Sequence, residues 1–193
     1  MNIVIKKLNN MKNGILDIAN LNLTQLPESL LWKDVKTLYC SYNRLKSLPE
    51  LPNVEHLWCH CNLLTNLPNL PNVKTLHCDD NKLTILPDLP KVRYLYCSIN
   101  QLVKLPELPA VKKLMCNNNN LVSLPDLPKV KHLHCQNNQL TSLLNLPKVK
   151  SLDCYHNKLI QLPDLPKIKQ LHCRNNQLIS KITRIACSKE INV

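Results

Sequence analysis

The chain has 193 residues, which suits a single domain on length alone. With one glycine, fourteen prolines and no phenylalanine, the composition excludes a core filled by phenylalanine rings and indicates one built from leucine, valine and cysteine. The net charge of +12 is large for this size, and its placement along the chain matters more than its total.

Residues 1–14 follow no repeat, and Asn13-Gly14 is a turn signal. We interpret this segment as an N-terminal cap that contains one short strand. Its single three-residue apolar run, followed by charge, fits neither a signal peptide nor a membrane span. A degenerate repeat of 22 residues follows, in which Leu16 takes the place of Leu38. The linker after it carries Trp32, which we expect to pack on the first turn.

Eight units of 19 residues come next, and a fixed period near 20 is typical of stacked-repeat proteins. After Leu178 the offset shortens to 14, so residues 182–187 are interpreted as a truncated terminal strand and 188–193 as a tail. The repeat region therefore covers residues 15–187. Cysteine and asparagine recur once in each unit, at Cys40, Cys59, Cys78, Cys97, Cys116, Cys135, Cys154 and Cys173, and at Asn43, Asn62, Asn81, Asn100, Asn119, Asn138, Asn157 and Asn176.

Each unit contains Val-x-x-Leu-x-Cys, in which apolar and variable residues alternate. Alternate side chains of a strand point to opposite faces, so the leucine and the cysteine point inward and the residue between them points outward. Such short strands can satisfy their backbone only by pairing with the same strand of the next unit, which predicts one long parallel sheet. The Leu-Pro-x-Leu-Pro segment that follows favours extended, polyproline-like backbone and leaves no room for a helix.

The pattern Leu-x-x-Leu-x-(Leu/Cys)-x-x-Asn-x-Leu resembles the core of the leucine-rich repeat family over roughly residues 15–187. The short period with Leu-Pro-x-Leu-Pro is similar to repeats of bacterial type III secreted effectors and of large DNA viruses of protists. The resemblance implies an α/β-class solenoid by family, in practice mostly β: a horseshoe with a concave parallel sheet and an irregular convex side. It also implies that the repeated asparagines bond neighbouring backbone and that the concave sheet binds other proteins. Effector relatives often carry a C-terminal ubiquitin-ligase domain, an activity we do not expect here because the chain stops at Val193.

Leu-His-Cys recurs in three units, and His and Cys are zinc ligands. His134 and Cys135 are adjacent in one strand, however, so they point to opposite faces and cannot meet on one ion. We interpret the repeated cysteines as small buried hydrophobic residues with reduced thiols, which favours a cytosol-like intracellular compartment. Cys61 lies outside this pattern and is the one thiol to test for reactivity.

The variable positions at the strand exits carry most of the aromatic residues. Tyrosine and tryptophan are favoured at protein-binding hot spots, although aromatic residues also suit exposed strands. We expect the N-terminal half to hold the primary contact and His132 to His172 a secondary one. The predicted protein-binding residues are Tyr39, Tyr42, Trp58, His60, His77, Tyr94 and Tyr96.

Basic residues follow the valine that opens most strands, while acids lie between the prolines on the opposite side. A basic rim of this kind attracts nucleic acid or other polyanions, but it also serves as a solvated edge that prevents sideways pairing of a sheet. Under the alternative, polyanion-binding function, the contact residues are Lys91, Arg93, Lys112, Lys129, Lys131, Lys148, Lys150, Lys167 and Lys169.

No Ser-His-Asp, Cys-His-Asn or phosphate-loop pattern is present in the sequence. We therefore expect a non-enzymatic protein-interaction module, pathogen- or virus-encoded and directed at host proteins. The expected form is a monomer with another protein as its partner, and with no cofactor, no metal, no small-molecule substrate and no membrane contact.

Overall fold

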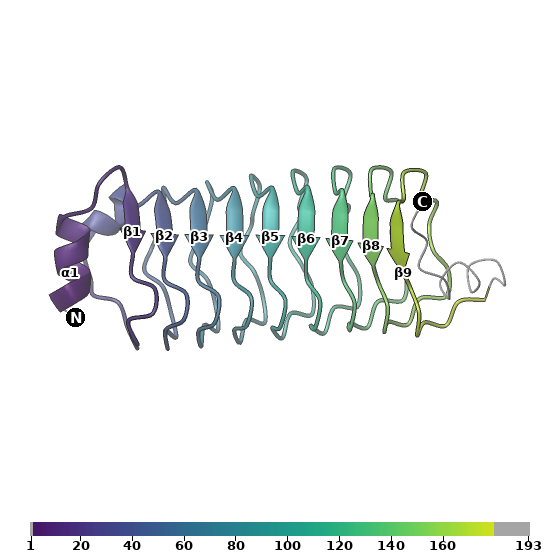
Figure 1. Ribbon diagram of the computed structural model, residues 1–193, viewed down its shortest axis with the longest axis horizontal. Helices are drawn as coiled ribbons and strands as arrows, with labels where there is room; N and C mark the ends of the chain where they lie inside the picture. The colour runs from purple at the N-terminus through teal and green to yellow at the C-terminus, as the bar shows by residue number, and fades with distance from the viewer. Residues whose placement is uncertain (1, 180–193) are drawn as a thin grey trace.

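A computed structural model describes residues 2–179 of the protein. Nine short strands form one sheet, all of them parallel and in sequence order, so that each strand pairs with the strand of the next unit (Figure 1). The predicted terminal strand at 182–187 and the tail lie outside the described residues. The strands are β1 (Ile15–Asp17), β2 (Thr37–Tyr39), β3 (His56–Trp58), β4 (Thr75–His77), β5 (Tyr94–Tyr96), β6 (Lys113–Met115), β7 (His132–His134), β8 (Ser151–Asp153) and β9 (Gln170–His172).

The central leucine of each strand sets the register of the sheet. Leu38 pairs with Leu57 and Leu57 with Leu76, and this pattern continues to Leu171. Leu16 pairs with Leu38 across the 22-residue repeat, as the sequence alignment predicted. Backbone bonds continue the ladder beyond each strand, for example from the amide of Cys59 to the carbonyl of His77 at 2.8 Å. The expected leucine-rich repeat solenoid with a parallel sheet is confirmed.

The core lies behind the sheet and consists of columns of identical residues. The strand leucines and the repeated cysteines from Cys40 to Cys173 are buried, most of them with no exposed surface, and they form one continuous apolar cluster. Burial raises the pKa of the thiols from Cys40 to Cys154, to about 12 for Cys154 and well above the ordinary value for Cys97. They therefore pack as small hydrophobic residues, as predicted. Cys173 is disulfide-bonded, so the expectation of a reduced thiol is wrong at this position.

The repeated asparagines hold consecutive units together behind the strand ends. Asn119 accepts a bond from the Leu102 amide at 3.0 Å and donates to the carbonyls of Cys97 (3.0 Å) and Cys116 (3.1 Å). The same bonds recur from Asn43 to Asn176. Each amide thus satisfies buried backbone groups of its own unit and of the unit before it.

The chain between consecutive strands from β2 to β9 contains only turns, bends and irregular backbone. Figure 1 shows these segments returning behind the sheet in near-identical loops. The leucines of Leu-Pro-x-Leu-Pro point into the core: Leu89 and Leu108 are at most 1% exposed. The predicted absence of helix from the proline-rich side therefore holds across these units.

The expectation of a strand in the N-terminal cap is wrong, because Asn2–Asn9 forms an α-helix, α1. Val4 and Leu8, one turn apart, are buried against the first repeat, so the segment closes the core with a helical apolar face. Trp32 packs there as predicted, buried in a 3₁₀ helix (Leu30–Asp34) with its Nε1 donating to the carbonyl of Pro27 at 2.9 Å. No helix in residues 2–179 has the length and apolar character needed to span a bilayer.

Gly14 joins the cap to the sheet in a conformation that other residues rarely adopt. Its φ is +71°, and its carbonyl accepts bonds from the amides of Lys36 (2.8 Å) and Thr37 (3.0 Å). A Cβ atom at this position would lie 2.8 Å from the carbonyl oxygen of Asp34. We expect Gly14→Ala to lower the free energy of unfolding by about 1–3 kcal/mol. Denaturant unfolding measures this, with the exposed Lys12→Ala as control; equal midpoints for the two variants would contradict it.

Candidate functional site

The exposed face of the sheet, called the open face below, carries a ladder of four aromatic rings. Tyr39, Trp58, His77 and Tyr96 occupy the last position of β2, β3, β4 and β5. Their ring centroids are 4.6 Å apart from Tyr39 to Trp58, 5.4 Å from Trp58 to His77 and 4.0 Å from His77 to Tyr96, with planes inclined by 9–23°. We refer to these four residues as the aromatic ladder.

The ladder follows directly from the in-register parallel sheet. Strands lie about 4.8 Å apart, close to the spacing of stacked rings, so identical positions in consecutive units stack face to face. Each ring covers the face of the next, and all four side chains are only partly buried. The interior ring faces of the ladder are therefore covered by the neighbouring rings.

The three remaining residues of the predicted protein-binding set lie beside the ladder. His60 contacts His77, with ring centroids 6.2 Å apart, and its Nδ1 lies 3.1 Å from the hydroxyl of Ser41. Tyr42 meets His60 edge to face at 5.1 Å, but it lies in the turn after the strand and is 56% exposed. Tyr94 begins β5 and is also exposed.

The imidazole of His77 is uncharged at neutral pH. Burial in the ladder, together with the nearby His60 and Lys113, lowers its pKa from 6.5 to about 4. The unfolded chain therefore binds more protons than the folded protein between pH 6.5 and about 4, so this group's contribution to stability is lost as the pH falls through that window.

We expect acidification from about pH 7 to pH 5 to destabilise the wild type by about 1 kcal/mol more than His77→Phe, a value reduced for the half-exposed ring. Phenylalanine keeps the stacking and cannot be protonated. Thermal unfolding of both proteins across this range is the measurement. If the stability of the two proteins changes equally with pH, the lowered pKa of His77 is contradicted.

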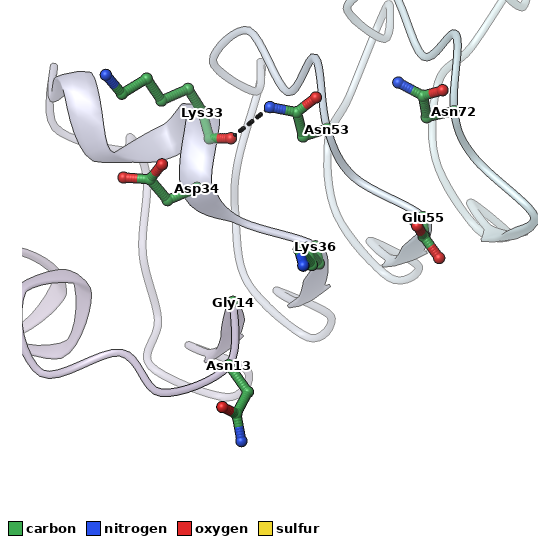
Figure 2. A pocket seen from close by; sticks show the side chains of 8 residues that line it. All are labelled: Asn13, Gly14, Lys33, Asp34, Lys36, Asn53, Glu55 and Asn72. Carbon is green, nitrogen blue, oxygen red and sulfur yellow. Dashed lines mark hydrogen bonds between the residues drawn. The ribbon is translucent and has the colours of Figure 1, made fainter.

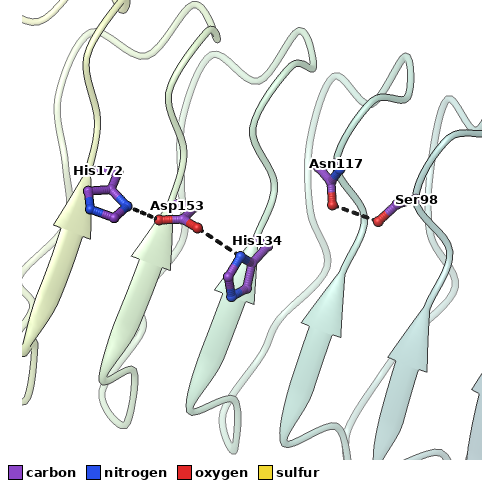
Figure 3. Close-up of polar contacts among 5 residues, drawn as sticks. All are labelled: Ser98, Asn117, His134, Asp153 and His172. Atoms are coloured by element: carbon purple, nitrogen blue, oxygen red, sulfur yellow. Dashed lines mark hydrogen bonds and ion pairs between the residues drawn. The ribbon is translucent and has the colours of Figure 1, made fainter.

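The last position of each strand, which carries the aromatic ladder in β2 to β5, carries polar residues in β7, β8 and β9. Asp153 on β8 is bound on both sides by histidine: Nδ1 of His134 on β7 lies 2.8 Å from Oδ2, and Nδ1 of His172 on β9 contacts Oδ1 (Figure 3). These contacts, above all that with His134, lower the pKa of the Asp153 carboxyl against the opposing effect of burial. Figure 3 also shows the Ser98 hydroxyl donating to Oδ1 of Asn117, at 2.6 Å. Our sequence analysis did not predict this clamp, although His134, Asp153 and His172 recur at the 19-residue period.

The basic rim predicted from the sequence lies at the N-terminal ends of the strands and on the segments that precede them. Its members from Lys91 to Lys169 are exposed. Lys74 is paired with Glu55, Nζ to Oε2 at 2.5 Å, and the remaining ion pairs within residues 2–179 are the two at Asp153. The rim from Arg93 onward therefore has no acidic side chain bonded to it in this part of the chain.

Eight residues that follow strands β2 to β9 have left-handed backbone, a feature our sequence analysis did not predict. They are Tyr42, Cys61, Asp80, Ile99, Asn118, Asn137, His156 and Asn175, each with φ between 51° and 56°. Among non-glycine residues, Asn, Asp and His are the most frequent in this region. Five of the eight residues are of these types, and their recurrence at one position of the unit is the sequence feature that indicates left-handed backbone. Burial and Asp80 raise the pKa of the Cys61 thiol, which disfavours a reactive thiolate at this position.

A polar hollow lies where the cap meets the first units (Figure 2). Asn53 donates to the carbonyl of Lys33 at 2.8 Å across it, and Gly14, Asp34 and Glu55 also line it. The hollow is lined by two lysines and two carboxylates, so their formal charges cancel. Residues 2–179 contain no cluster of three His, Cys, Asp or Glu side chains placed to hold a metal ion.

Comparisons with known proteins identify the repeat. Residues 33–72 and 128–167 match the family model described as "Leucine Rich repeats (2 copies)". No curated protein sequence gives a significant match. Among solved structures, YopM of Yersinia pestis, described as a leucine-rich effector protein, is 30% identical with a TM-score of 0.77, and the alignment covers 93% of this chain and 60% of that one.

Two further structures show the same similarity. YopM of Yersinia enterocolitica is 28% identical with a TM-score of 0.69, and the alignment covers 93% of this chain and 51% of that one. A Shigella effector leucine-rich repeat domain is 28% identical with a TM-score of 0.66, over 97% of this chain and 81% of that domain. The chain thus spans only 51–60% of the length of the two YopM structures.

Proposed function

Because this chain is a leucine-rich repeat solenoid, we propose that it is a non-enzymatic protein-interaction module that binds its partner through the aromatic ladder. The single observation that carries this proposal is the contact of four partly exposed rings across β2 to β5. Tyr39, Trp58, His77 and Tyr96 form its centre, and Tyr42, His60 and Tyr94 lie at its margin.

The ladder has the physical properties of a protein-binding hot spot. Tyrosine and tryptophan provide large contact areas and lose little side-chain freedom on binding. Here the rings already support one another, so the ordering of side chains that normally opposes association is largely complete before the partner arrives. The amide-rich face of later units, with Asn117 and Gln136, offers polar groups that must each be matched on desolvation.

The similarity to YopM and to the Shigella effector supports a more specific proposal, that the partner is a host protein and that the chain is pathogen- or virus-encoded. Eight free thiols within residues 2–179 support an intracellular, reducing location, whereas the disulfide at Cys173 is evidence against it. The resemblance to repeat proteins of large DNA viruses of protists stays a prediction.

A second candidate function is electrostatic binding of nucleic acid or another polyanion through the basic rim. The basic side chains of the rim from Arg93 to Lys169 are exposed and form no ion pair within residues 2–179, which favours it. The ladder does not add to it, because nucleobases stack on free ring faces and the interior faces of the ladder cover one another.

Capture from a cell lysate distinguishes the two functions. Wild type is compared with Trp58→Ala plus Tyr96→Ala, each with and without nuclease. We expect the double variant to lose the partner and nuclease to have no effect. Equal recovery by both proteins would contradict the ladder as the site. Loss of recovery after nuclease, with a steep decline in added salt, would establish the polyanion function instead.

A further inference from the structure

The open face has a basic recess directly beside the aromatic ladder. It is lined by Tyr94, Lys112, Lys113, Lys131 and His132, which begin or directly precede β5, β6 and β7. These side chains bring three ammonium groups, a phenol and an imidazole together at one point of the sheet. No carboxylate lines the recess.

Three acidic side chains at or beside the sheet already have polar partners. Glu55 is bound by Lys74, and Asp153 is clamped between His134 and His172. Asp79 accepts a bond from the Ser98 amide at 3.0 Å. The lysines of the recess therefore have no ion pair with a carboxylate within residues 2–179. The positive potential also acts on His132, whose pKa is lowered first by burial and then by Lys113, His134, Lys150 and Lys131.

The recess is joined to the ladder through one side chain. Nζ of Lys113 lies 5.2 Å from the ring centroid of Tyr96, the last ring of the ladder. This cation–π contact positions the ammonium group at the end of an apolar stripe. A ligand that runs along the ladder therefore reaches the recess without leaving the sheet.

We propose that this recess binds the oxyanion of an acidic or phosphorylated side chain, carried by an extended polypeptide that lies along the aromatic ladder. The inference rests on the proposed function and names the chemistry of the partner. Several ammonium donors and a phenol suit a carboxylate or a phosphate, which accepts several charge-assisted hydrogen bonds at once. The covered faces of the interior ladder rings favour apolar peptide side chains over nucleobases as the neighbouring contact.

The length of such a ligand follows from the sheet. Six strands at about 4.8 Å span about 24 Å from β2 to β7, which an extended peptide of about eight residues covers. A suitable probe is a fluorescent octapeptide with two leucines followed by two glutamates, separated by serines. A second probe carries phosphoserine in place of the glutamates and a third carries glutamine. A short oligothymidine represents nucleic acid.

Binding is measured by fluorescence anisotropy at about 0.15 M salt. We expect the glutamate and phosphoserine peptides to bind about tenfold more tightly than the glutamine peptide, and Lys113→Gln plus Lys131→Gln to remove that advantage. The matched control is Lys148→Gln plus Lys167→Gln, which makes the same change in net charge at exposed positions away from the recess and should retain the advantage. Thermal unfolding confirms that both double variants are folded.

Several results would overturn the proposal. Equal losses in the two double variants would show diffuse attraction to a basic surface. Equal binding of the glutamine peptide, or absence of binding by both acidic peptides, would show that the recess holds no oxyanion. Preferential binding of the oligothymidine would assign the recess to nucleic acid. If partner capture depends on Trp58 and Tyr96 but not on Lys113 and Lys131, the proposed oxyanion site is wrong. The proposed protein-binding function of the ladder is then retained.

Discussion

Asn119→Ala is expected to lower the free energy of unfolding by about 2–4 kcal/mol without altering the open face. The side chain is 8% exposed and bonds the Leu102 amide and the carbonyls of Cys97, Cys116 and Asn117. Alanine leaves the buried amide and carbonyls without these partners, and no water can reach them easily. Because each unit packs only on its neighbours, the defect weakens the stack at its centre.

A matched control lies one residue away. Asn120 is exposed, so Asn120→Ala makes the same chemical change outside the core. Urea unfolding followed by circular dichroism compares the two variants with wild type. If Asn119→Ala unfolds at the same urea concentration as Asn120→Ala, the asparagine bonds do not hold the units together.

Truncating the ladder is expected to reduce partner affinity at least about a hundredfold, since hot-spot side chains each contribute about 2 kcal/mol or more. The variant is Tyr39→Ala, Trp58→Ala and Tyr96→Ala together. Removing these three side chains leaves His77 as the only ring of the ladder, so both the contact area and the rigid stacking are lost. The side chains are only partly buried, and the strand leucines beneath them are untouched, so the fold should survive.

A melting curve of the triple variant separates loss of the site from loss of the fold. Affinity for the captured partner is then measured by calorimetry or surface binding. Unchanged affinity in a folded variant would show that the ladder contributes nothing to recognition.

The repeat explains why so much of the fold was predictable. Leu38, Leu57 and Leu76 follow the alternation of a strand, and the 19-residue period places them in one register. The inward cysteines, the irregular proline-rich side and the placement of His134 and Cys135 on opposite faces all follow from the same two periodicities. Because the same pattern recurs in eight units, few other folds are compatible with the sequence.

The features that the sequence analysis missed depend on single residues or on side-chain geometry. Helix α1 lies outside the repeat, where only the spacing of Val4 and Leu8 indicated a helix. Ile99 has left-handed backbone although β-branched residues disfavour it. The residue type at this position therefore gave no indication of the turn. The clamp on Asp153 depends on the side-chain conformations of two histidines in neighbouring units. The period of the sequence repeat does not specify these conformations.

The central claim is that the partner binds the aromatic ladder and not the histidine-bearing half of the same face. Two variants of equal size test it: alanine at Tyr39, Trp58 and Tyr96, and alanine at His134, Asp153 and His172. Partner affinity is measured for both against wild type, after melting curves confirm that both are folded. The account predicts that the first variant loses binding and the second retains most of it. Loss of binding in the second variant with full binding in the first would contradict it.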